Sequence, residues 1–212
     1  MMDLPTVPKK FLKATKTIES DYLIISNRAK CSEIIANSEL SEEDVIDALI
    51  SLHLVLEIGL NTIFRYISLW SIRKDVPTLD IINNIDRVSF LDKTTMFIYN
   101  SKFNLVTEDD FYKATEYHSL IERIKDFSSM RNRLLHGYSI CSVFDGSKNI
   151  ESSTKSKINL ENLQRQITKF KLIMEGMRFY VDKLDCPITK EGKENLKKSY
   201  LDDSFLPILK VL

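Results

Sequence analysis

The side chains best suited to chemistry lie in one short stretch, "MRNRLLHGY", at positions 130–138. On a helical wheel of about 100° per residue, the apolar residues within about 40° of Arg131 are Leu120, Ile124, Phe127 and Leu135. Arg131 is therefore predicted to lie on the apolar face of its own helix. An unpaired buried charge is costly, so this guanidinium needs an anionic partner.

Glu57 is the acidic residue that best matches this arginine. It sits in the run "LHLVLEIGL" and shares a helical face with Ile50, His53, Leu60 and Phe64. A pair between Glu57 and Arg131 would join two helices and would need no further function. The other interpretation is that Arg131 holds a phosphate.

Asn132 and His136 are four residues apart, so they share a second face of the same helix. Gly137 suits a left-handed cap, which predicts that the helix ends at His136. A histidine at a helix C-terminus can serve simply as a cap or as a partner of the helix dipole. Beside Arg131, Asn132 and Arg133, however, it belongs to a cluster that can hold a phosphate. The residues expected to make this face polar are Lys125, Ser128 and Ser129.

Arg131 and His136 diverge by about 140° within one regular helix. Two arrangements would still let them act together. The helix end could distort, or a second copy of the chain could bring its own motif close. The second arrangement predicts a homodimer.

The elements that must position these residues are helices. Apolar spacing predicts a first helix over about 9–37, with Phe11, Ile18, Tyr22, Ile25 and Ala29 on one face. "SEED" predicts a capped start at Ser41 for a central helix that runs to about residue 73. A weaker helical region spans about 77–102, and "TEDD" opens the motif helix near Thr107.

After the motif, "YSICSVFDGSKNI" alternates apolar and polar residues around Asp145-Gly146, which predicts a short β-hairpin near 139–152. Asn159 is expected to cap the last long helix. Apolar residues recur every three or four positions along that helix, which indicates a seam of a helical bundle. These residues are Leu160, Leu163, Ile167, Phe170, Met174, Met177, Val181 and Leu184. We expect an all-α bundle of about five helices over residues 1–184, with a tail over 185–212 that docks on it.

Composition narrows the class of protein. The 212 residues carry 30 basic and 30 acidic side chains, so non-specific attraction to nucleic acid is not predicted. Cys31, Cys141 and Cys186 are far apart and form neither a disulfide framework nor a zinc motif, which suits the cytoplasm. The N-terminal residues lack the apolar core of a signal peptide, and the longest uncharged run is too short to span a bilayer. We expect no cofactor, no metal and no membrane partner.

The stretch "RNRLLHGY" resembles the R-x-x-x-x-H-x-Y signature of the HEPN superfamily, and the polar residue after the arginine fits as well. The run "LHLVLEIGLNTIFRY" is similar to that family's second helix, which tends to carry an acidic residue. The resemblance in architecture covers about residues 9–184. The chain is longer than the toxins that share the signature, and the predicted hairpin separates the motif from the last helix.

This resemblance implies a helical bundle that dimerises through its motif helices and a metal-independent endoribonuclease, acting as a toxin or in antiviral defence. Arg131 and His136 would be catalytic, supported by Asn132, Arg133 and Glu57. Tyr138 matches the tyrosine that nucleotidyltransferase-type antitoxins modify in some related toxins. Two alternatives remain at this point. One is a non-catalytic module that binds a nucleotide or RNA, and the other is a structural helical protein that binds a partner.

Overall fold

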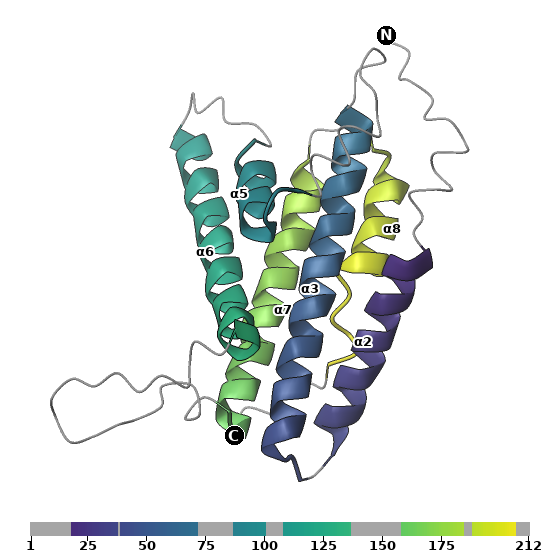
Figure 1. Ribbon diagram of the computed structural model, residues 1–212. Coiled ribbons are helices and arrows are strands. Elements are labelled where there is room, and N and C mark those ends of the chain that lie inside the picture. The colour runs from purple at the N-terminus through teal and green to yellow at the C-terminus, as the bar shows by residue number, and fades with distance from the viewer. Residues whose placement is uncertain are drawn as a thin grey trace, which may run out of the picture.

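The computed structural model describes residues 18–37, 39–71, 87–100, 108–136, 158–184 and 188–206, which contain six helices and no strand (Figure 1). The all-α class is therefore confirmed for the described residues. The hairpin predicted at 139–152 lies outside them. The helices are α2 (Ile18–Ala36), α3 (Glu42–Ser71), α5 (Phe90–Asn100), α6 (Glu108–His136), α7 (Leu160–Lys183) and α8 (Lys190–Tyr200).

Helix α3 is the centre of the bundle and contacts each of the other five described helices. It begins as predicted, because Ser41 Oγ accepts a hydrogen bond from the Asp44 N–H at 3.1 Å and Asp44 Oδ2 accepts one from the Ser41 N–H at 2.9 Å. In Figure 1, α2 lies on one flank of α3, and α6 lies on the other. The central helix thus separates the N-terminal helix from the motif helix.

Helix α3 also has an unusual composition. Residues 42–68 form a helical stretch that is long and apolar enough to cross a membrane, judged by length and composition alone. The longest run without a charged residue in this stretch is, however, shorter than the roughly 20 residues that a membrane span needs. Most of the apolar window in this stretch is buried inside the bundle. The core helix of a bundle has the same composition, since neighbours cover it on every side.

The face predicted for the first helix is wrong. Tyr22 and Ile25 of α2 are 67% and 64% exposed, whereas Ile24, Cys31 and Ile34 are buried. The helix carries two apolar stripes at helical spacing, and it packs mainly on α3. Only one stripe can face a single neighbour, and the spacing of residues along the chain does not say which.

Helix α7 follows its prediction closely. Asn159 caps it by accepting a hydrogen bond from the Asn162 N–H at 2.8 Å. Met174 and Met177 are fully buried, so this stripe forms intramolecular core rather than a groove for a partner. Leu160 is the exception among the seam residues, because it is 52% exposed in the first turn of the helix.

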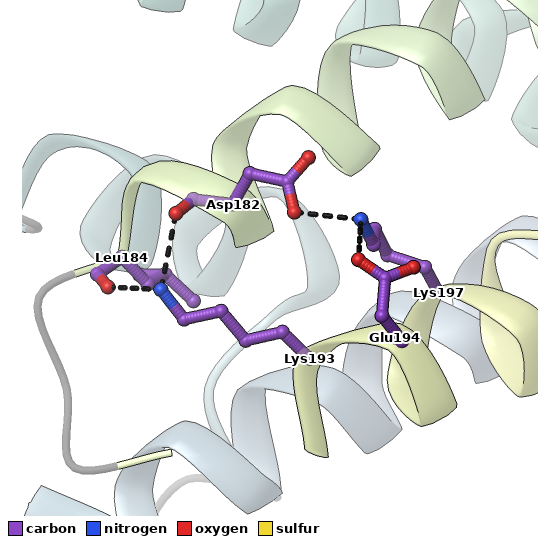
Figure 2. Close-up of polar contacts among 5 residues, drawn as sticks. All are labelled: Asp182, Leu184, Lys193, Glu194 and Lys197. Carbon is purple, nitrogen blue, oxygen red and sulfur yellow. Dashed lines mark hydrogen bonds and ion pairs between the residues drawn. The ribbon is translucent and has the colours of Figure 1, made fainter. Parts of the chain in front are cut away.

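Helix α8 falls within the segment 185–212, where the sequence predicted a tail and no helix. Figure 2 shows how it is held against the end of α7. Lys193 Nζ donates to the carbonyl oxygens of Asp182 at 3.0 Å and Leu184 at 2.6 Å. Lys197 Nζ pairs with the carboxylates of Asp182 at 2.6 Å and Glu194 at 2.7 Å. Lys193 thus satisfies carbonyl groups that a helix C-terminus leaves without partners, and Lys197 adds an ion pair between the two helices.

The apolar face of α8 and the residues that follow it also pack on the bundle. Leu196, Tyr200 and Leu201 are buried, and α8 contacts both α3 and α7. Arg178 of α7 donates to the Leu201 carbonyl oxygen at 2.8 Å and to Asp203 Oδ1 at 3.0 Å. Residues 188–206 are therefore part of the core.

Candidate functional site

Arg131 lies on the apolar face of α6, as the helical wheel predicted. Leu120, Ile124 and Phe127 on that face are buried. The Arg131 side chain is 29% exposed, so its guanidinium sits at the edge of the core. Leu135 has no described side chain.

The predicted pairing of Arg131 with Glu57 is confirmed, but the contact is long. Arg131 Nη2 lies 3.9 Å from Glu57 Oε2. Arg131 Nη1 donates a hydrogen bond to Asn132 Oδ1 at 3.0 Å. Arg131 Nε is buried and has no hydrogen-bond partner among the described residues. The guanidinium has five N–H donors, so these contacts leave it with unused capacity.

Glu57 has a closer partner than Arg131. His53, one turn earlier in α3, places its Nε2 3.1 Å from Glu57 Oε2. This hydrogen bond is the main reason that the pKa of the Glu57 carboxyl is lowered, and the charges of His53, Arg131 and Lys93 act in the same direction. Burial of the carboxyl opposes the shift. Glu57 is therefore an ionised carboxylate that cations surround.

His53 is a site residue that sequence reasoning missed, because it was placed on the Glu57 face of the central helix without any role in the site. Its ring is 2% exposed and stacks on Phe127, with ring centroids 6.0 Å apart. Phe90 of α5 packs edge-on against it at 6.2 Å. The sequence pattern that could have identified it is the spacing of His53 and Glu57, which are four residues apart on one face of the central helix.

Lys93 of α5 is a second missed residue. It is 6% exposed and contributes to the electrostatic environment of Glu57. No pattern around it in the sequence suggested burial. Helices α3, α5 and α6 thus bring two cations and one carboxylate together with His53.

A pocket of about 220 Å³ opens beside these groups. It is lined by residues from α3, from the start of α5 and from α6: His53, Glu57, Ser89, Phe90, Leu91, Ser128, Arg131 and Asn132. Ser128 was expected on a polar outer face, but it is 2% exposed and its Oγ has no partner among the described residues. Its neighbour Ser129 is exposed, as predicted.

His136 is the last described residue of α6, and the predicted cap at Gly137 lies outside the described residues. The side chains of Arg133 and His136 lie outside the described residues, and so does Tyr138. Helix α6 is continuous from Glu108 to His136, so the backbone carries Arg131 and His136 at the angular separation of a regular helix.

Among the described residues, no group of three or more His, Cys, Asp or Glu side chains is placed to hold a metal ion. The cations and the pocket suit a ligand that carries negative charge.

Comparisons of the chain with protein-family models, with curated proteins and with solved structures found no match.

Proposed function

We propose that the protein is a metal-independent endoribonuclease of HEPN type, whose composite site contains Arg131 and His136 from two copies of the chain. The observation that carries this proposal is the state of Arg131. It lines a pocket and keeps unused donors, while its carboxylate partner lies 3.9 Å away and is engaged more closely by His53. A purely structural ion pair would be expected to use the guanidinium more fully.

The chemistry follows from the residue types. The ribose 2′-oxygen attacks the adjacent phosphorus, the bond from phosphorus to the 5′-oxygen breaks, and a 2′,3′-cyclic phosphate forms. A base accepts the 2′-OH proton, and an acid protonates the leaving 5′-oxygen. Two copies of His136 in one cleft can fill both roles, since imidazole titrates near neutral pH. Arg131 would stabilise the charge that develops on the phosphate oxygens.

The homodimer belongs to the same proposal. The angle of about 140° between Arg131 and His136 on one regular helix keeps them from meeting within a single copy. Light scattering on the purified protein should give about twice the chain mass of 24.6 kDa. A monomer at micromolar concentration would contradict the composite site.

RNA cleavage by purified variants tests the proposal. His136→Ala should abolish cleavage, and the matched control is His118→Ala, which changes an exposed histidine on the same helix. Arg131→Ala should also abolish cleavage, whereas Arg123→Ala, at an exposed position of α6, should not. Products should end in 2′,3′-cyclic phosphate or 3′-phosphate. Equal cleavage by the wild type and His136→Ala, or activity that EDTA removes and magnesium restores, would refute the mechanism.

A second candidate is a non-catalytic module that binds a nucleotide or RNA. The pocket beside Arg131 favours it, because its described lining already brings together donors that suit a phosphate. Binding of RNA without any cleavage, lost in Arg131→Ala and kept in His136→Ala, would select this function.

A further inference from the structure

The pocket between α3, α5 and α6 has the features of an anion site at a helix N-terminus. Phe90 and Leu91 form the first turn of α5 and line the pocket. The N–H groups of a first helical turn have no acceptor within their own helix, and they attract anions. We propose that this pocket binds a phosphate group.

Buried donors on the opposite wall give independent support. Ser128 is 2% exposed, its Oγ has no partner among the described residues, and it lines this pocket. A buried hydroxyl without a partner destabilises the fold unless a ligand satisfies it. Arg131 and Asn132 line the pocket one turn further along α6, and Arg131 can present two N–H groups to one phosphate.

Glu57 also lines the pocket, but its negative charge is already compensated by other groups. Its carboxylate accepts the His53 hydrogen bond and lies among the positive charges of Arg131 and Lys93. The Asp92 carboxylate at the start of α5 is likewise occupied, because it accepts a hydrogen bond from the Ser89 hydroxyl at 2.6 Å. Ser128 Oγ and Arg131 Nε, which have no partner among the described residues, are therefore the donors left for an anion.

The size of the pocket limits the ligand. Its volume of about 220 Å³ is smaller than the roughly 300–1,000 Å³ of sites for drug-sized molecules. It therefore fits a phosphate with a small attached group such as one ribose. The phosphate could belong to the backbone of RNA or to a free phosphomonoester, and the experiment below separates these sources.

This inference rests on the proposed function in one respect, because Arg131 would act both in RNA cleavage and in phosphate binding. The test of the pocket changes Ser128 and leaves His136 in place, so phosphate binding is measured independently of cleavage. The site would hold a phosphate on the side of α6 that faces α3 and α5. It would thereby set the position of the strand or nucleotide relative to the cleavage centre.

Thermal denaturation of the full chain tests the pocket, with inorganic phosphate, adenosine 5′-monophosphate and a short RNA without a terminal phosphate as separate ligands. Potassium chloride at matched ionic strength is the control for salt. The decisive variant is Ser128→Ala, and its matched control is Ser129→Ala at the exposed neighbouring position. Removal of an unsatisfied hydroxyl should leave the unliganded fold at least as stable as the wild type. It should weaken phosphate binding by about 10-fold or more.

Inorganic phosphate should raise the melting temperature of the wild type and of Ser129→Ala, and much less that of Ser128→Ala. A Ser128-dependent shift with the monophosphate alone identifies a phosphomonoester ligand, and one with the RNA identifies the phosphodiester backbone. No shift beyond potassium chloride, or equal shifts in both serine variants, would overturn the proposal. Cleavage that needs His136 would survive that result, so failure of the pocket and failure of the nuclease are separable.

Discussion

Replacing Glu57 with glutamine tests the electrostatic arrangement behind Arg131. The substitution keeps the size of the side chain and removes its charge. It weakens the 3.1 Å contact with His53 and the 3.9 Å ion pair with Arg131. It also removes the carboxylate charge with which Lys93, 6% exposed, interacts electrostatically. We therefore expect the variant to fold with reduced stability.

The magnitude follows from the geometry. Breaking a fully buried ion pair costs about 3–5 kcal/mol. The side chains of Glu57 and Arg131 are 25% and 29% exposed, so water screens part of the interaction. The loss should then be about 2 kcal/mol, near the value of one hydrogen bond to a charged group. For a chain of this size, that loss corresponds to a fall of about 4–8 °C in melting temperature.

The loss of stability in Glu57→Gln should depend on pH in a characteristic way. The pKa of Glu57 is lowered in the folded state, so its ionised form stabilises the fold above its ordinary value of 4.5. This contribution is lost as the pH falls through the lowered pKa. The stability difference between the wild type and Glu57→Gln should therefore be full at neutral pH and shrink on acidification below about 4.5.

Urea denaturation at several pH values measures both quantities. The matched control is Glu175→Gln, because Glu175 is exposed in the middle of α7. A surface change of this kind should alter stability by less than about 0.5 kcal/mol. Equal effects of the two substitutions, or a Glu57→Gln deficit that stays constant down to pH 3, would refute the reasoning.

Three further predictions concern the core. Gly59→Ala should destabilise the protein by about 1–3 kcal/mol in urea denaturation, because the added Cβ would lie 2.7 Å from the Tyr200 carbonyl oxygen. Unchanged stability would contradict the close approach of α3 and α8. Gly176→Ala should cost less, because its Cβ meets the flexible end of the Leu120 side chain at 2.8 Å. Cys31 should resist a thiol reagent at pH 8 until the protein unfolds, because it is fully buried and burial raises the pKa of its thiol to about 12; modification of native protein lacking the other two cysteines would show that α2 opens readily.

The local features of this protein could be predicted from its sequence. The caps at Ser41 and Asn159 were predicted correctly, because capping depends on side chains within one turn of the helix end. The position of Arg131 on an apolar face and its pairing with Glu57 were also predicted. Both depend on helical spacing and on the cost of burying a charge, and both can be read along one chain.

Which helix faces are buried, and which side chains lie in contact, depends on packing between helices. Spacing predicted a face of α2 that contains Tyr22 and Ile25, whereas packing on α3 buries Ile24, Cys31 and Ile34. In the same way, contact of α6 with α3 and α5 buried Ser128 and brought His53 to the pocket. Periodicity specifies the faces of a helix, but the choice of the buried face depends on contacts between residues far apart in the chain, which local sequence does not encode.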